Sequence, residues 1–353
     1  MTPISVLVLS TSPVNRVRIT KLVSDLPELE VVAVAANVSE AFTLAEARAP
    51  NVVIVAEDFR GLDEFSALKS LFYALGARWI FVDAGAGKHR QSLLMVPGSA
   101  GRMLAEPVLD LTMPKAALME PIRQVLSITR SPAKQAPVER GLGSGQASGA
   151  VYDKMVVIGS STGGVDALLT VLSSFPEDCP PTAIVQHTGH GFSDSLIRLL
   201  ERRCRPQVVA AQDGLTLKQG MICVAAGSLG HLTVTPGAAI RCHLRAGAPI
   251  SGHVPSVTAL FRSAVALAPQ VVGVILTGMG QDGAAGLLDL HRAGCVTIGQ
   301  DEATSVVYGM PRAAWEIGAV QTRLPITRIG PELLRASLAP ASQHIHANQM
   351  VTR

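Results

Sequence analysis

Short, continuous apolar runs alternate along this chain with segments of helical periodicity, and this alternation limits the possible folds more than any other feature. Runs of strand length in the second half are Met155–Ile158, Thr182–Val185, Val208–Ala210, Met221–Val224 and Val272–Leu276. Helix-like segments follow several of them, at Val165–Ser174, Asp194–Arg202, Val257–Leu267 and Ala284–Ala293. Strands that are apolar on both faces are typical of parallel sheets with helices on both sides. The second half is therefore predicted to be a doubly wound α/β domain.

The first half shows the same alternation. Its strand-like runs are Ser5–Leu9, Val52–Val55 and Trp79–Val82, and helix-like segments between them are Val14–Leu26 and Ser39–Ala47. Residues 131–150 then mix Pro, Gly, Ser and Ala with almost no large apolar side chain, a composition that buries too little surface to become ordered. We therefore expect a doubly wound α/β domain over 1–128, a flexible linker over 129–150, the second domain over 151–340 and a loose tail over 341–353.

Composition excludes several functional classes. The chain has 353 residues, 48% of them hydrophobic, and a net charge of only +3 without a long basic run, which disfavours a nucleic-acid-binding protein. No apolar run approaches the roughly 18 residues that span a bilayer, and no charged leader precedes the first strand, so a cytoplasmic protein without membrane insertion is expected. The 5 cysteines are scattered and lack C-x-x-C spacing, which predicts buried or half-buried free thiols.

The first apolar run after the linker ends in a turn that can expose a serine. Residues 159–164 read GSSTGG and lead from the predicted strand directly into a predicted helix. They contain the G-x-S-x-G pattern, in which a strand-turn-helix arrangement presents a serine hydroxyl at the edge of a sheet. Free N–H groups at the helix start would stabilise an oxyanion. Ser161 is thus a candidate nucleophile, and helix capping or phosphate binding is the alternative role of the turn.

A histidine and an aspartate follow two other predicted strands. His187 comes just after the second apolar run, and Asp282 lies in the Gly-rich turn after the fifth. Residues beyond the carboxyl ends of parallel strands share one edge of the sheet, so these two could act with Ser161 as base and orienting carboxylate. His190 is an alternative base. Taken singly, a strand-end histidine can be satisfied by carbonyl groups, and Asp282 can cap the following helix.

Two hypotheses from other functional classes stay open at this point. Gly278, Gly280 and Gly283 match G-x-G-x-x-G, and Asp301 and Glu302 follow at about the offset of a ribose-binding acid, which suggests a dinucleotide-binding oxidoreductase. Such a fingerprint normally opens the first βαβ unit of its domain, whereas this one follows at least four predicted strands. The other hypothesis is a catalytically inactive signalling scaffold, which an intact serine, histidine and aspartate set disfavours.

Residues 155–320 closely resemble the catalytic domain of the chemotaxis-receptor methylesterases, the CheB family. The resemblance rests on IGSSTGG at 158–164, QH at 186–187, PSV at 255–257, LTGMGQDGAAG at 276–286 and YGMPRAA at 308–314. It implies that Ser161, His187 and Asp282 form a catalytic triad. It also implies that Thr162 and Met279 line the site, with the Met279 backbone as an oxyanion donor.

The resemblance implies a reaction and partners as well. The expected reaction is hydrolysis of glutamate γ-methyl esters on the cytoplasmic helices of chemotaxis receptors, and deamidation of receptor glutamines is compatible with it. No metal or organic cofactor is expected, and the receptors and other chemotaxis signalling proteins are the expected partners. Thr258 stands where the family usually carries an aspartate, and His253 where an arginine often sits shortly before Pro255. Because both are outside the implied triad, these differences are expected to affect the fit of the substrate more than the chemistry.

The first 128 residues resemble the response-regulator receiver domain that precedes the esterase in this family. Aspartyl phosphorylation requires an acceptor carboxylate, an acidic pair for magnesium and a lysine. The aligned positions carry other residues: Ser10 and Thr11 for the acidic pair, Ala56 for the acceptor and Glu106 for the lysine. Neither Glu57 nor Asp58 is expected to replace the acceptor. The domain is therefore predicted to be a pseudo-receiver without a phosphorylation site, retained for docking or gating.

Overall fold

The structure is a computed structural model that describes residues 3–59, 72, 77–83, 93–95, 103–105, 108–110, 115–127, 149–188, 193–227 and 230–339. Packing divides the chain into two compact units, Met1–Ala136 and Pro137–Arg353. Most of the predicted linker and all of the predicted tail lie outside the described residues.

The first unit contains a parallel sheet. Its described strands lie in the order β2-β1-β3-β4-β7, with bounds β1 Ile4–Leu9, β2 Leu29–Ala35, β3 Val52–Ala56, β4 Arg78–Asp83 and β7 Val108–Asp110. This order is that of flavodoxin-like doubly wound sheets, as predicted for the fold class. A short antiparallel pair, β5 Leu93–Met95 with β6 Met103–Ala105, is separate from the sheet.

Helices cover this sheet. The described ones are α1 Pro13–Ser24, α2 Val38–Arg48, α4 Lys115–Ser127 and the 3-10 turn η1 Glu57–Phe59. Residues of α1 and α4 share one hydrophobic core with β1, β3 and β4, whereas α2 packs on β1 and β2. The sequence starts α1 in the usual way, because Ser12 accepts the Asn15 N–H and Pro13 occupies the first turn.

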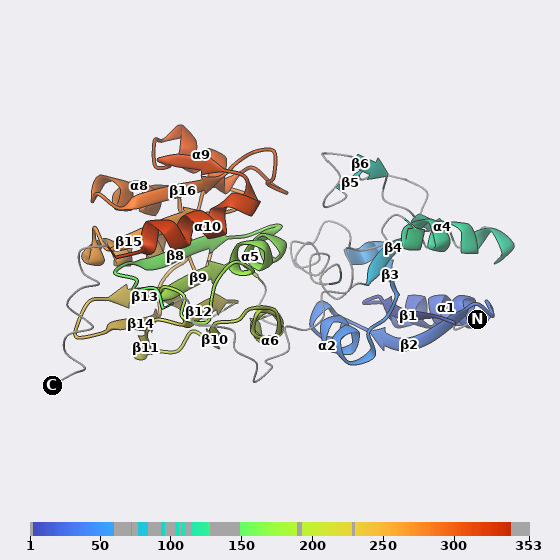
Figure 1. The fold of residues 1–353 in the computed structure, drawn as a ribbon. Coiled ribbons are helices and arrows are strands. Elements are labelled where there is room, and N and C mark those ends of the chain that lie inside the picture. The colour runs from blue at the N-terminus through green and yellow to red at the C-terminus, as the bar shows by residue number, and fades with distance from the viewer. Residues whose placement is uncertain are drawn as a thin grey trace. The chain divides into compact units, whose positions relative to one another are not determined.

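The second unit is built on a longer parallel sheet (Figure 1). Its strand order is β10-β12-β9-β8-β15-β16-β17, and every pairing is parallel. The bounds are β8 Met155–Ser160, β9 Thr182–Gln186, β10 Gln207–Ala210, β12 Met221–Ala226, β15 Val271–Ile275, β16 Val296–Gln300 and β17 Thr322–Leu324. The strands of this sheet that follow β8 up to β12 lie on one side of β8, and β15 with the strands after it lies on the other. The crevice at such a switch point is where open α/β sheets bind ligands.

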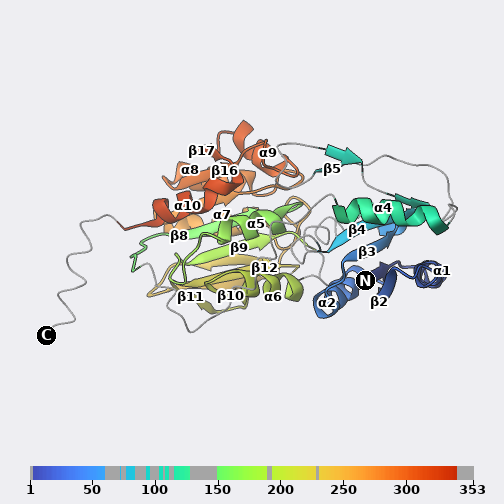
Figure 2. The same cartoon turned by 45° about the vertical axis from the view of Figure 1, so that its right-hand side comes forward.

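Helices lie on both faces of this sheet (Figures 1 and 2). One face carries α5 Gly164–Leu172, α6 Ser193–Arg203 and α10 Ile326–Ser337. The other carries α7 Val257–Ala264 with the 3-10 turn η3 Val265–Leu267, α8 Ala284–Arg292 and α9 Met310–Glu316. The central strands β8, β9, β12 and β15 are buried along their whole length. The continuous apolar runs in the sequence reflect this two-sided cover.

A small antiparallel sheet adds a layer that the sequence analysis did not predict. Its order is β11-β14-β13, with bounds β11 Leu215–Leu217, β13 His231–Thr235 and β14 Ile240–Arg245. Strand β13 packs directly on α7, and Leu232 and Val234 join the same core as Leu260 and Phe261 of that helix. The contact places the start of β13 near the start of α7, which matters for the active site.

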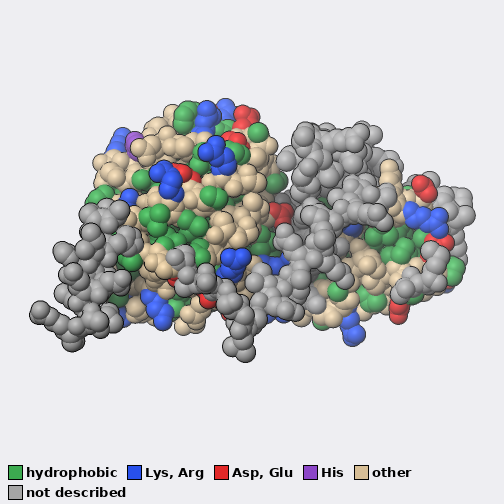
Figure 3. Space-filling view, viewed as in Figure 1, with side chains coloured by type: hydrophobic (Ala, Val, Ile, Leu, Met, Phe, Trp, Pro, Cys, Tyr) green, Lys and Arg blue, Asp and Glu red, His purple; other side chains and the backbone are tan. Residues whose placement is uncertain are grey.

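Three expectations from composition can be compared with the structure. All five cysteines are free and buried, as predicted. On the visible face of the second unit, Lys and Arg side chains are scattered and do not gather into one patch (Figure 3). None of the helices within the described part of the chain is long and apolar enough to cross a membrane.

Candidate active site

Ser161 is the first residue after β8, where the strand turns into α5. Its N–H donates to Thr277 O at 3.0 Å, and its carbonyl accepts the Gly164 N–H at 2.8 Å. Within the described residues no hydrogen bond occupies the Ser161 hydroxyl. The predicted turn is therefore present, and its serine is half-buried at the edge of the sheet with the hydroxyl unengaged.

Gln186 holds this turn beside the end of β9. It is buried, and its Oε1 accepts the Ser160 hydroxyl at 2.6 Å. Its Nε2 donates to Ser161 O at 2.8 Å and to His187 O at 2.9 Å. Ser160 and Gln186 are partners in the β8–β9 pairing, so Ser161 and His187 occupy the next positions beyond two neighbouring strands. The Gln186 side-chain amide thus fixes the backbone positions of both Ser161 and His187.

His187 contacts Asp282 through Nε2, which lies 2.9 Å from Asp282 Oδ2. Both side chains are buried, with exposed fractions of 7% and 0%. Because the ionised carboxylate can only accept, Nε2 carries the proton and Nδ1 is the basic nitrogen of the neutral ring. Nδ1 is buried and has no hydrogen-bond partner among the described residues. The His187 ring also stacks on His253, with centroids 3.8 Å apart and planes 12° from parallel.

The Asp282 carboxylate is surrounded by donors. They are His187 Nε2 and Val257 N on Oδ2, and Ser256 Oγ, Thr258 N and Gly283 N on Oδ1. Ser256 is the N-cap of α7, so two of the donors are the first N–H groups of that helix, where the helix dipole favours a negative charge. Burial raises the pKa of Asp282, but the hydrogen bonds outweigh burial and hold this pKa far below its usual value. Asp282 is a permanent anion at neutral pH.

Two glycines permit these close approaches. Gly283 has φ 91°, and a Cβ there would lie 2.6 Å from Val257 Cγ1, so only glycine lets α7 begin against Asp282. Gly278 faces the nucleophile turn, where an added Cβ would lie 2.7 Å from Ser161 Cβ. The Gly-rich segment after β15 therefore places Asp282 against His187. It also places Met279, the residue after Gly278, close to Ser161.

Two backbone N–H groups flank Ser161. Those of Thr162 and Met279 donate to no acceptor among the described residues, whereas the nearby Gly278 N–H donates to Val307 O at 3.0 Å. Thr277 joins the two segments, because its hydroxyl donates to Thr162 O at 3.0 Å. Paired, unengaged N–H groups beside a nucleophile are the geometry of an oxyanion hole. The Met279 side chain is 59% exposed at the rim.

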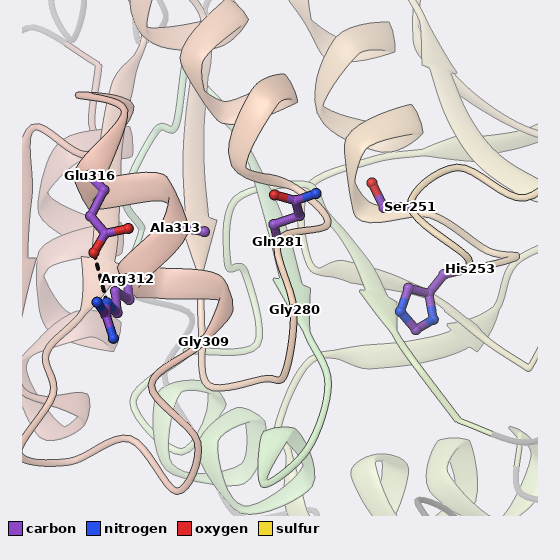
Figure 4. A pocket seen from close by; sticks show the side chains of 8 residues that line it. All are labelled: Ser251, His253, Gly280, Gln281, Gly309, Arg312, Ala313 and Glu316. Atoms are coloured by element: carbon purple, nitrogen blue, oxygen red, sulfur yellow. Dashed lines mark hydrogen bonds and ion pairs between the residues drawn. The ribbon is translucent and has the colours of Figure 1, made fainter.

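A cavity of about 570 Å³ adjoins this arrangement (Figure 4). It is lined by Ser251, His253, Gly280, Gln281, Gly309, Arg312, Ala313 and Glu316. His253 is the ring stacked on His187, and Gly280 and Gln281 connect Met279 to Asp282. At one edge Arg312 Nε and Glu316 Oε1 form an exposed ion pair of 2.7 Å. The cavity is large enough for a substrate side chain, and His253, which stacks on the His187 ring, forms part of its wall.

Comparison with known proteins identifies the family. The family model described as CheB methylesterase matches residues 156–333. A protein of Rhizobium etli named protein-glutamate methylesterase/protein-glutamine glutaminase is 39% identical over 346 residues, which cover 96% of this chain and 97% of that protein. The chain belongs to the CheB methylesterase family.

Other members support the assignment. A Caulobacter vibrioides protein named protein-glutamate methylesterase/protein-glutamine glutaminase 1 is 39% identical, over 95% of this chain and 98% of its own length. The crystal structure of the Thermotoga maritima CheB methylesterase catalytic domain matches 52% of this chain and 99% of that domain, with 33% identity and a TM-score of 0.50.

In this CheB family member His187 contacts Asp282, Ser161 and His187 occupy the next positions beyond two neighbouring strands, and Thr162 and the Gly278–Met279 segment adjoin Ser161. The alternative base, His190, lies outside the described residues. Thr258 lies against Asp282, because its N–H donates to Asp282 Oδ1 at 3.1 Å and its hydroxyl accepts the Gly283 N–H at 2.8 Å. Its expected effect on the fit of the substrate stays a prediction. With the Gly283 N–H already engaged and the family established, the dinucleotide hypothesis loses its support.

Sequence reasoning missed what Ser256 does. A serine before an apolar helix predicts an N-cap, which Ser256 is, but no sequence pattern shows that the cap also donates to a carboxylate 26 residues away.

In the first unit, Ala56 ends β3 and is buried. The Thr11 N–H donates to Asp58 Oδ2 at 2.9 Å, and the Thr11 hydroxyl donates to the same oxygen. Arg16 Nη1 donates to Ser10 O at 2.7 Å and to Thr11 O at 2.9 Å. The Asp58 carboxylate, two residues after the aligned acceptor position, is thus tied to the loop after β1. Glu106 lies outside the described residues.

Proposed function

We propose that this protein hydrolyses glutamate γ-methyl esters on chemotaxis receptors, with Ser161 as nucleophile, His187 as base and Asp282 as orienting carboxylate. The observation that carries the proposal is the buried Asp282–His187 pair, whose remaining ring nitrogen is basic and unpaired beside the serine turn. The names of the relatives supply the substrate class.

The reaction follows from the roles of these groups. Ser161 Oγ attacks the ester carbonyl while His187 Nδ1 takes its proton, and Asp282 stabilises the imidazolium that forms. The Thr162 and Met279 N–H groups receive the developing oxyanion. His187 returns the proton to the methoxy group, methanol leaves, and a glutamyl ester of Ser161 remains. Water, deprotonated by the same nitrogen, releases glutamate and the free serine.

Deamidation of receptor glutamines is the second reaction that we propose for this site. An amide passes through the same tetrahedral geometry, and the proton on His187 then goes to the leaving ammonia. The relatives are named for both activities.

Methanol release from a methylated receptor by the full chain and by Ser161→Ala tests the proposal. Ser161→Ala should lower the rate by about 10⁴-fold or more while circular dichroism stays unchanged, because a triad acts as one unit. Ser160→Ala is the matched control on the neighbouring residue. It removes the bond to Gln186 and should reduce the rate only in part. A Ser161→Ala variant that keeps more than roughly a tenth of the activity would reject Ser161 as nucleophile.

A further inference from the structure

His231 is a buried histidine behind the triad, at the start of β13, with 5% of its surface exposed. Its Nδ1 lies 3.1 Å from the Ser256 N–H, and its Nε2 lies 3.0 Å from Ala248 O. An N–H can only donate and a carbonyl can only accept. The contacts therefore define a neutral ring with an unprotonated Nδ1 and a proton on Nε2.

The two contacts hold both ends of one segment, Ala248–Ser256. Between these ends the chain folds back, with Ile250 N donating to His253 O at 3.2 Å and His253 N donating to Ile250 O at 3.0 Å. The segment carries two groups that contact the triad. His253 stacks on the His187 ring, and the Ser256 hydroxyl donates to Asp282 Oδ1 at 2.8 Å.

The bond from His231 Nδ1 to Ser256 also supplies an acceptor that the start of α7 lacks. In a capping box, the N–H of the N-cap residue is accepted by a Glu or Gln side chain at the third helical position. That position in α7 is Ala259, which has no acceptor in its side chain. Ser256 is fully buried, so bulk water does not reach its N–H either. His231 supplies the acceptor from a distant strand, and this fixes the residue that holds Asp282.

We infer that His231 is a positioning residue for the triad: its neutral imidazole clamps Ala248–Ser256 and thereby aligns Asp282 and His187. The inference rests on the proposed function of Ser161, His187 and Asp282. His231 touches neither the cavity nor these three side chains, so it acts on the reaction only through Ser256 and His253. Its loss is expected to lower kcat more than it changes KM.

The experiment compares three variants of the full chain in methanol release across pH. His231→Leu removes both bonds and should lower kcat by up to about 100-fold, the effect of a misplacement of about 1 Å. A less well held Asp282 stabilises the His187 imidazolium less, so the midpoint of the acidic limb should move to lower pH. His231→Gln keeps one acceptor and one donor and should restore most of kcat and the wild-type midpoint.

The matched control is His243→Leu. His243 lies on the neighbouring strand β14, and both ring nitrogens are engaged, with Thr235 Oγ1 at 3.1 Å and Asp213 Oδ1 at 3.1 Å. Among the described residues it has no hydrogen bond to the segment Ala248–Ser256. His243→Leu removes these two bonds and should leave kcat and the midpoint of the acidic limb at wild-type values. The comparison therefore separates a positioning role of His231 from a general loss of stability.

Folded His231→Leu with wild-type kcat and an unchanged midpoint overturns the inference. If that variant does not fold, imidazole ¹⁵N NMR of the wild-type chain decides, with His231→Gln used for assignment. An unprotonated Nδ1 throughout the active pH range supports the clamp, and a protonated Nδ1 in active protein overturns it.

Ser161→Ala is run in parallel. Full activity of that variant rejects the proposed function and the inference with it, whereas an inactive Ser161→Ala beside an unaffected His231→Leu rejects only the inference.

Discussion

His187 presents Nε2 to its carboxylate, so the nitrogen left for the serine is Nδ1, the one closer to the main chain. In the familiar Ser-His-Asp arrangement the two nitrogens have the opposite roles. A base that acts through Nδ1 depends more strongly on where its backbone lies, because the ring cannot swing this atom far from Cα. The Gln186 bonds to Ser161 O and His187 O supply that backbone control.

The first residue-scale prediction concerns pH. Esterase activity should rise with pH through the range in which histidines titrate, about pH 5 to 8, because Nδ1 must be unprotonated to take the Ser161 proton. Rates of methanol release at saturating substrate, measured across this range, test it. His190→Ala should keep the profile and most of the rate, and His187→Ala should lose activity. A flat profile would contradict histidine catalysis.

The second residue-scale prediction concerns the charge of Asp282. Asp282→Asn should lower activity by up to about 10⁴-fold, because the carboxylate that orients the histidine is lost. It should also lower the free energy of unfolding at pH 7 by about 2 kcal/mol, because hydrogen bonds to a charged carboxylate are replaced by weaker bonds to a neutral amide. Because the folded-state pKa of Asp282 is depressed, its charge stabilises the fold fully above the usual carboxyl pKa of about 4 and loses this effect as pH falls through the folded value. Urea unfolding at pH 7 and pH 3 should show the difference between wild type and Asp282→Asn shrinking in acid. An equal difference at both pH values would contradict a charge effect.

At the scale of elements, burial explains which strands the sequence revealed. The central strands β8, β9, β12 and β15 of the parallel sheet in the second unit were predictable because helices cover both faces, so their residues form continuous apolar runs. Strands β13 and β14 are only partly buried, with intermediate residues in both strands and exposed residues in β14. The sequences HLTVT and IRCHLR contain too many polar residues to stand out as runs. Helix α10 was missed as well, because Gly330 and Pro331 lie inside it.

The residues of the site also fall into those that the sequence predicted and those that it did not. Ser161, His187 and Asp282 were predictable because parallel strands place their carboxyl ends at one edge. Ser256 and His231 were not predicted, because their roles depend on how β13 packs against α7, a contact with no local signature.

The element-scale prediction uses the two ends of α8. Gly283→Ala should lower the free energy of unfolding by about 3 kcal/mol, because it adds a strained φ and a clash with Val257, and it should also displace Asp282 and reduce activity. Gly294, just beyond the other end of α8, has φ 83° with nothing within 4 Å of its added Cβ. Gly294→Ala should therefore cost only about 1 kcal/mol. Chemical denaturation of both variants checks this, and equal losses would argue against the close α7 approach.

At the scale of the whole molecule, the two units differ in what their chemistry permits. Ala56 has no oxygen to accept a phosphoryl group, and Ser10 and Thr11 have no carboxylate for magnesium. The nearby Asp58 carboxylate is engaged with Thr11. We expect that the first unit does not control the esterase through phosphorylation, since a switch requires a ligand that binds two states differently.

Acetyl phosphate with magnesium tests this expectation on the full chain. It should neither add mass to the protein, read promptly by intact-protein mass spectrometry, nor change the rate of methanol release. Activation that is lost in Glu57→Gln or Asp58→Asn would show that a neighbouring carboxylate has taken over the acceptor role.

The carboxylate of the triad reaches His187 across 95 residues of chain, on the segment that follows β15. A nascent chain that has left the ribosome only as far as β12 contains Ser161 and His187 but neither the orienting anion nor the second oxyanion donor. Such an intermediate should have little esterase activity. Recovery of esterase activity after dilution from denaturant should therefore require the docking of β15 onto β8, the pairing that carries Asp282 and Met279 to the half of the sheet that holds Ser161 and His187.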